Sequence, residues 1–222
     1  MSQIDLTAFF LTLKLAFITT FLLYLAGIPI SYYIAYSKSK LAFLLEALCS
    51  LPLVLPPTVL GFYLLLLLSK EGPIGSVWYK LFDRQLVFHF EGIVVSSFIY
   101  SLPMMVHPLS AGFRSVPKSL IEASLSLGKG PVYTLLRVVL PNMKASLLTG
   151  GVLSFAHTMG EFGVVLMVGG NIEGETRVVS IAIYDAVEKI DYTTAHVYSA
   201  LLLLLSFLSL AVLYAINRRW SF

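Results

Sequence analysis

The sequence predicts an all-α integral membrane protein with about five transmembrane helices, an outside N-terminus and an inside C-terminus. Three observations predict this fold class. First, 58% of the 222 residues are hydrophobic, only 12% are charged, and the mean hydropathy is +0.87. Second, several apolar runs reach the roughly 20 residues that a helix needs to cross the hydrocarbon core. Third, the loops between these runs alternate between basic and mixed-to-acidic composition.

Five apolar runs are long enough to span the membrane, and they cover residues 9–36, 44–68, 92–112, 138–157 and 195–216. They should be helices, because irregular backbone is unstable in lipid and the runs lack the alternation of a membrane β-barrel. Two shorter apolar segments within residues 161–190 predict a possible sixth element, broken or re-entrant. We see no internal repeat and expect a single domain over residues 7–217.

Basic residues predict the orientation. Nine of the 15 lie in the first loop, in or just beyond the third loop, and in the tail, against one clear acid, Glu122. The second and fourth loops are mixed to acidic. The positive-inside rule therefore places the loops and the tail that carry these nine basic residues in the cytoplasm. It predicts a multi-pass protein of the cytoplasmic (inner) membrane. The nine residues are Lys38, Lys40, Arg114, Lys118, Lys129, Arg137, Lys144, Arg218 and Arg219.

The sequence lacks the residues that are characteristic of several functional classes. The single cysteine, Cys49, forms neither an internal disulfide nor a cysteine-rich metal site, so we expect no bound metal. There is no GxxxxGK[ST] loop, so we expect no nucleotide cofactor on this chain. No catalytic triad is visible, and no basic cluster is dense enough for nucleic acid. We therefore expect neither an enzyme nor a nucleic-acid-binding protein, and the chain's main surroundings should be membrane lipid.

A polar, glycine-punctuated segment at residues 117–137 interrupts the apolar runs on the basic side. Pro117 can start a short amphipathic helix and Gly128 can end it, while Pro141 is placed to start the next span. The apolar face of such a helix must be covered. It can pack on its own bundle, lie in the lipid interface, or fit a groove on a cytoplasmic partner.

This segment resembles the cytoplasmic motif of bacterial ABC importer permeases, which reads Glu-Ala-Ala, three residues, Gly, nine residues, Ile, one residue, Leu-Pro. Every spacing agrees, with Ser124 in place of an alanine and Val138 in place of the isoleucine. LPLVLPPTVLGFYLLLLL, at residues 51–68, and GEFG, followed by GGNIEGETR, resemble molybdate-type permeases. The motif residues expected to couple to an ATPase are Glu122, Ala123, Ser124, Gly128, Leu140 and Pro141.

The resemblance implies a type I ABC importer-like fold and a homodimer of permease chains. It also implies two cytoplasmic ATPase subunits, carrying ATP and magnesium and seated on the coupling segment, and an external oxyanion-binding protein. The implied substrate is molybdate, with tungstate or sulfate as alternatives. A stand-alone channel or secondary transporter is the rival class, but it would need intramembrane ionisable residues, which are nearly absent.

Six residues are candidates for the transport pathway or a hinge: Pro52, Pro56, Pro57, Gly160, Glu161 and Gly163. The prolines kink the second span, which is either functional or a tolerated bend. A bare carboxylate would repel an anion, so we expect Glu161 to serve as a helix cap or to pair with Arg177. We expect His107 and His157 to be hydrogen-bonded structural residues.

Overall fold

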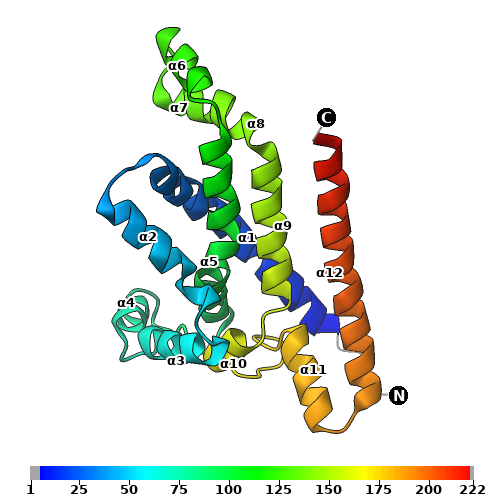
Figure 1. Ribbon diagram of the computed structural model, residues 1–222. Coiled ribbons are helices and arrows are strands. Elements are labelled where there is room, and N and C mark those ends of the chain that lie inside the picture. The colour runs from blue at the N-terminus through cyan, green and yellow to red at the C-terminus, as the bar shows by residue number, and fades with distance from the viewer. Residues whose placement is uncertain (1–5, 221–222) are drawn as a thin grey trace.

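The computed structural model describes residues 6–220, which are mainly helical (Figure 1). Three of the helices are each long and apolar enough to cross a membrane: α1 (Leu6–Tyr36), α5 (Phe90–Ser115) and α12 (Tyr192–Trp220). The other elements are α2 (Lys40–Ser50), η1 (Leu51–Leu53), α3 (Pro57–Leu68), α4 (Pro73–Phe82), α6 (Lys118–Ser126), α7 (Pro131–Thr134), η2 (Leu135–Val139), α8 (Leu140–Asn142), α9 (Lys144–Met159), α10 (Gly163–Gly169) and α11 (Val179–Glu188).

The centre of the bundle is formed by α1, α5 and α9 (Figure 1). Small residues let these helices approach closely, as is usual where lipid offers no hydrophobic drive for helix association. A Cβ at Gly27 of α1 would lie 2.7 Å from Met105 Cγ, and one at Gly151 of α9 would collide with the Tyr24 hydroxyl. That hydroxyl instead donates to the carbonyl of Leu147 at 2.7 Å and ties α1 to α9.

The second predicted span differs from a single helix over residues 44–68. It consists of α2 with η1 and then α3, and the two parts are bent by 114°. The break falls at Pro56, which is extended (φ −55°, ψ 137°), and at Pro57, which begins α3. Proline removes a backbone donor and disfavours helix at the residue before it, so the double proline explains the break.

The fourth predicted span, residues 138–157, also differs in the structure. α9 begins only at Lys144, and it is bent by 77° from the preceding helical stretch Pro131–Asn142. Residues 138–142 therefore lie before the bend, with the helical stretch Pro131–Asn142. A π-helical turn, η2, carries the chain from α7 to α8. Such turns are poorly signalled by an apolar sequence pattern.

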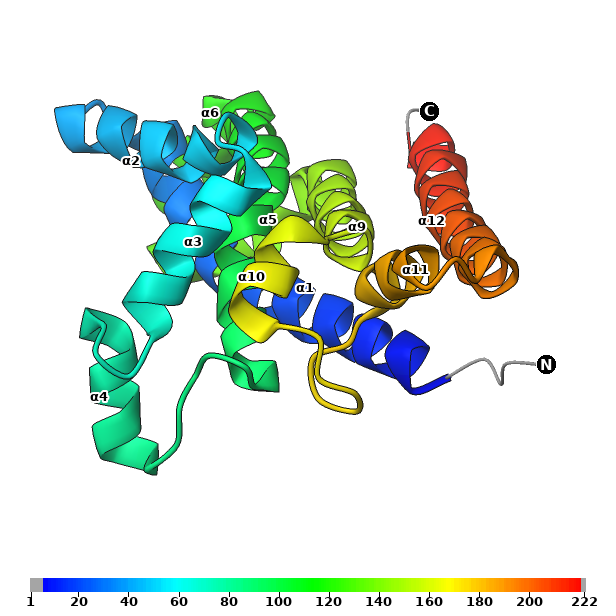
Figure 2. The ribbon, with the colours of Figure 1, turned by 90° about the horizontal axis from the view of Figure 1, so that it is seen from below.

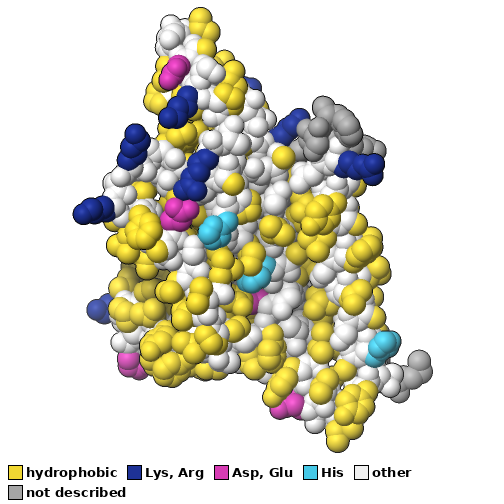
Figure 3. All heavy atoms as spheres, in the orientation of Figure 1, with side chains coloured by type: hydrophobic (Ala, Val, Ile, Leu, Met, Phe, Trp, Pro, Cys, Tyr) yellow, Lys and Arg dark blue, Asp and Glu magenta, His cyan; other side chains and the backbone are white. Residues whose placement is uncertain are grey.

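The two ends of the bundle differ in charge. The α1–α2 loop, the α6–α8 segment and the end of α12 lie at one end, and α4 and α11 lie at the other (Figure 1). Most Lys and Arg side chains on the face shown in Figure 3 lie toward the first end. This arrangement fits the basic cytoplasmic loops predicted from the sequence.

Residues 161–190 contain two short helices. α10 packs on α3 and α5, with Val164, Val165 and Val168 buried, and α11 packs on α12 (Figure 2). α10 is thus largely enclosed by protein, whereas residues 171–174, which follow it, are exposed.

Candidate functional site

The motif predicted to couple to an ATPase forms a projection beyond the rest of the bundle (Figure 1). It consists of α6, α7, η2 and α8, and it follows α5 after two residues, Val116 and Pro117. Pro117 precedes the first residue of α6 as its N-cap, as the sequence predicts. Pro131 begins the next helix, α7.

A tight turn joins α6 to α7. Gly128 has φ +74°, in the left-handed region that glycine adopts without penalty, and its N–H donates to the Leu125 carbonyl at 2.9 Å. The N–H of Lys129 reaches back to the Ser124 carbonyl at 3.2 Å. These bonds satisfy carbonyls at the end of α6 and give the turn a defined geometry.

Ser124 is the residue that replaces the second alanine of the motif. Its hydroxyl lies 2.9 Å from the hydroxyl of Thr134 on α7, and both side chains are buried. The Thr134 hydroxyl donates to the carbonyl of Gly130 at 3.1 Å, so Ser124 is the donor to Thr134. The bond closes α6 onto α7. Sequence reasoning missed it because the two residues belong to separate helices.

The tip of the projection exposes a large apolar surface, which we call the projecting surface. Glu122 and Ala123 are exposed beside it. Exposed fractions reach 77% for Leu127 and 67% for Val132. Exposed apolar patches of this kind mark protein–protein or membrane interaction sites. The surface consists of Leu120, Leu125, Leu127, Val132, Tyr133 and Leu136.

The last two motif residues lie at the base of the projection. Leu140 packs against the cluster that includes Phe113 and Val139. Pro141 lies inside the short helix α8, so it does not begin the next span as the sequence predicts. The bend at Met143 separates it from α9.

Four of the six pathway candidates meet around one cavity of about 530 Å³: Pro57, Gly160, Glu161 and Gly163. A Cβ at Gly163 would lie 3.0 Å from Pro57 Cβ, so the double-proline break sits directly against the start of α10. Pro52 is buried in η1, and neither it nor Pro56 lines the cavity. The sequence missed the other lining residues Thr58, Tyr100, Ala156 and Phe162, and it assigned His157 only a structural role.

Glu161 has neither of the contacts predicted for its side chain. α10 starts without a side-chain cap, and Arg177 pairs with Glu173 (Nη1–Oε2, 3.6 Å), so both predictions are wrong. Within residues 6–220, both carboxyl oxygens of Glu161 are buried without a hydrogen-bond partner. The predicted ion pair between Glu161 and Arg177 does not form because Arg177 is held in an outer turn.

That outer turn, residues 170–178, is closed by its own side chains. Arg177 Nε donates to Asn171 Oδ1 at 2.6 Å, and the Thr176 hydroxyl donates to the Gly169 carbonyl at 2.7 Å. Glu175 accepts the N–H of Phe90 at 3.1 Å and so anchors the turn to the start of α5. Nearby on α11, the hydrogen bond from Lys189 holds the pKa of Asp185 below its usual value.

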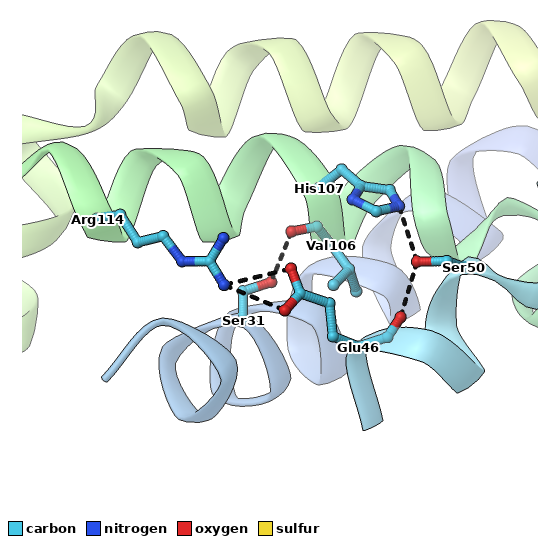
Figure 4. A network of polar contacts seen from close by, with 6 residues as sticks. All are labelled: Ser31, Glu46, Ser50, Val106, His107 and Arg114. Atoms are coloured by element: carbon cyan, nitrogen blue, oxygen red, sulfur yellow. Dashed lines mark hydrogen bonds and ion pairs between the residues drawn. The ribbon is translucent and has the colours of Figure 1, made fainter. Parts of the chain in front are cut away.

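Both histidines expected to be structural have hydrogen-bond partners. His157 Nδ1 lies 2.9 Å from the Ser101 hydroxyl, which also meets the Thr158 hydroxyl at 3.0 Å. His107 Nε2 lies 3.1 Å from the hydroxyl of Ser50 on α2 (Figure 4).

Comparisons with known proteins give the family. The model of the "binding-protein-dependent transport system inner membrane component" family matches residues 27–222. The "Molybdenum transport system permease protein ModB" of Azotobacter vinelandii is 45% identical over 218 residues, 98% of this chain and 96% of that protein. A probable sulfate transport system permease protein of Chlorella vulgaris is 32% identical over 96% of this chain and 79% of its own length.

Solved structures agree on the fold. An inward-facing MetNI methionine ABC transporter has a chain with a TM-score of 0.75 and 17% identity, covering 99% of both chains. A bacterial transporter that imports the acidic polysaccharide alginate has a TM-score of 0.74 and 17% identity, covering 99% of this chain and 80% of that one. With a family model over most of its length, a near-complete relative and the same fold, this chain belongs to the binding-protein-dependent transport system inner membrane components, as a multi-pass transport subunit of type I architecture.

Proposed function

We propose that this chain is the permease subunit of an ATP-driven importer that moves molybdate across the inner membrane. The observation that carries the proposal is the projecting surface. It exposes leucine, valine and tyrosine side chains at the basic end of the bundle, beyond the lipid-crossing helices. Such a surface needs a protein partner, and a stand-alone channel would have no use for it.

The partner is a pair of cytoplasmic ATPase subunits, each receiving one projection. ATP and magnesium bind there and not on this chain, which lacks a phosphate-binding loop. Closure of the ATPase pair moves the projection. Because α6 follows α5 after two residues, that movement passes into the centre of the bundle and biases it between inward-open and outward-open forms.

A second copy of the chain completes the pathway, and an external oxyanion-binding protein delivers the substrate to the end that carries α4 and α11. The cavity at Pro57, Gly160, Glu161 and Gly163 is the hinge region of each copy, where the broken second span meets α10. Hinges are usually a few residues in loops or at the ends of helices that absorb the change in backbone angles.

Molybdate is the favoured substrate because the 45%-identical relative is a molybdenum transport permease. Sulfate is the second candidate, since the 32%-identical relatives include probable sulfate permeases. Tungstate stays an alternative as well, because all three are tetrahedral dianions. The permease contacts them through similar hydrogen bonds, so the external protein makes most of the choice.

The test is ATP hydrolysis by the complex of this chain with its ATPase, reconstituted in lipid vesicles. The binding protein is supplied empty, molybdate-loaded, tungstate-loaded and sulfate-loaded. Stimulation by the molybdate-loaded form alone is the expected result. Equal stimulation by sulfate or tungstate keeps the importer and removes the substrate assignment. If the ATPase fails to assemble with the permease, the importer proposal itself is wrong.

A further inference from the structure

One face of α5 carries three polar residues at intervals of seven: Tyr100, His107 and Arg114. Seven residues are almost two helical turns, so the three lie on the same side of α5, separated by about 10 Å per step. Met104 and Ala111 fall between them on that side. We call this set the α5 stripe.

Each polar member of the stripe meets a polar group from another helix. The ring of Tyr100 lies 4.8 Å from that of His157 on α9. His107 contacts the Ser50 hydroxyl of α2. The Arg114 guanidinium bonds both carboxylate oxygens of Glu46 on α2 at 3.2 Å (Figure 4). The stripe thus runs from mid-helix to the cytoplasmic end.

The stripe is only partly covered by these partners. His107, Ala111 and Arg114 are exposed, and Tyr100 and Met104 are half-buried. Histidine and acidic side chains are visible at mid-height on this face of the molecule (Figure 3). Ionisable side chains at such depth are costly toward lipid and usually face a water-filled cavity or another protein surface.

Other exposed faces look different. On α1, Phe17, Phe21 and Leu25 are 60–65% exposed, and on α12 Leu203 and Phe207 are 71% and 64% exposed. These faces suit hydrocarbon. The apolar exposed faces of α1 and α12 are therefore suited to contact lipid, whereas the polar α5 stripe is suited to contact water.

We propose that the α5 stripe is one wall of a water-filled pathway, with Tyr100 and His107 donating hydrogen bonds to a tetrahedral oxyanion as it passes. This inference rests on the proposed function and names the site within it. The cavity of about 530 Å³ beside Tyr100 and His157 forms the wider part of the pathway. The second copy of the chain supplies the opposite wall.

The charges along the α5 stripe favour weak, transient contacts with the oxyanion over tight binding. Hydroxyl and imidazole donors attract an anion without a full opposing charge. The one cation of the stripe, Arg114, is already paired with Glu46 and so holds a dianion weakly. Glu161 lines the cavity, but both of its carboxyl oxygens are buried.

Cysteine labelling tests the inference, with the complex of permease and ATPase in lipid vesicles. The native Cys49 is buried and is replaced by alanine. Ala111→Cys then places a small reporter in the stripe, and Leu25→Cys is the matched control on the exposed face of α1. Both are treated with a negatively charged, membrane-impermeant methanethiosulfonate. We expect Ala111→Cys to react about tenfold faster or more, because a charged reagent enters hydrocarbon poorly. Labelling should also lower its uptake.

Two results would overturn the inference. Reaction of Ala111→Cys with an apolar maleimide but not with the charged reagent would place the stripe in lipid. Reaction with neither would mean that protein covers it. A functional arm uses His107→Gln, which keeps a donor, and His107→Leu, which does not. Uptake several-fold lower in the leucine variant alone is expected, and equal uptake in both would remove the donor role. The labelling requires no transport, so this inference and the importer proposal can fail separately.

Discussion

The hydroxyl of Ser124 on α6 donates to the hydroxyl of Thr134 on α7 across 2.9 Å, and this bond is buried inside the projection that we assign to ATPase coupling. The two residues are ten positions apart and lie on either side of the Gly128 turn. The bond therefore holds the two short helices in one orientation. A projection that transmits force must keep its shape, so this contact is a direct target for mutation.

Thr134→Val should weaken the projection. It leaves the Ser124 hydroxyl buried without its acceptor, at a cost of about 1–3 kcal/mol. Ser124→Ala should cost less, because Thr134 keeps its bond to the Gly130 carbonyl. The double variant should recover part of the loss, since removing both partners leaves no orphan. Retention of the ATPase during purification measures the effect, and a double variant worse than Thr134→Val would contradict this account.

Gly128→Val should leave the permease in the membrane but uncouple ATP hydrolysis from uptake or weaken assembly. The reason is its φ of +74°, which costs an L-residue about 1–2 kcal/mol and a β-branched one more. No atom lies within 4 Å of a Cβ built at Gly128, so crowding plays no part.

Gly130→Ala is the matched control for this turn. Gly130 has φ −71° and ψ 163°, which suits any residue, and the space around it is equally open. Its uptake and ATP hydrolysis should equal those of the unmodified chain. Equal loss in both glycine variants would mean that flexibility, and not the left-handed turn, matters here.

Gly61→Val should loosen the packing of α3 on α10. A Cβ at Gly61 would lie 2.8 Å from Met167 Cβ and 3.2 Å from the Val164 backbone, so the two helices would have to separate. Core overpacking of this kind costs about 1–3 kcal/mol. Lower thermal stability of the detergent-purified chain should report it. At Gly160, on the open side of the cavity, alanine should be tolerated, since a Cβ meets only carbonyl oxygens at 3.8 Å.

Thr12→Val should destabilise the junction of α1 with α11. The Thr12 hydroxyl accepts the N–H of Val179 at 2.9 Å and donates to the Ala8 carbonyl at 2.7 Å, and it is buried. Valine keeps the shape but orphans the Val179 N–H, at about 1–3 kcal/mol. Thr12→Ser should retain most of the stability in the same melting experiment. Identical melting of both variants would show that the bond contributes little.

The motif at residues 122–141 could be recognised from sequence because fixed spacings within one segment are visible there. The sequence pattern does not predict the local path of the backbone through this segment. The π-helical turn at residues 135–139 and the bend at Met143 move Pro141 out of the following span. The apolar run continues through both features, so hydropathy alone does not register them.

Glu161 illustrates the opposite limit. Its acidity and its neighbouring glycines identify it as a candidate residue. The partner of its side chain cannot be predicted locally, because that partner depends on residues distant in the chain. Arg177 lies in a turn closed by Asn171 and Glu173, out of reach of the carboxyl. The conformation of the turn decides which residues pair with Arg177, and no local sequence pattern specifies that conformation.

The sequence by itself determined the class of protein, its apolar segments, the side on which its basic loops lie and the motif to which we assign coupling. These follow from two local quantities, the length of apolar chain that crosses hydrocarbon and the placement of charge. Only the tertiary structure decided that Pro57 packs on Gly163, that Ser124 meets Thr134, and that Tyr100, His107 and Arg114 each meet a partner from another helix. Such contacts join residues distant in the chain, and close packing between helices selects them.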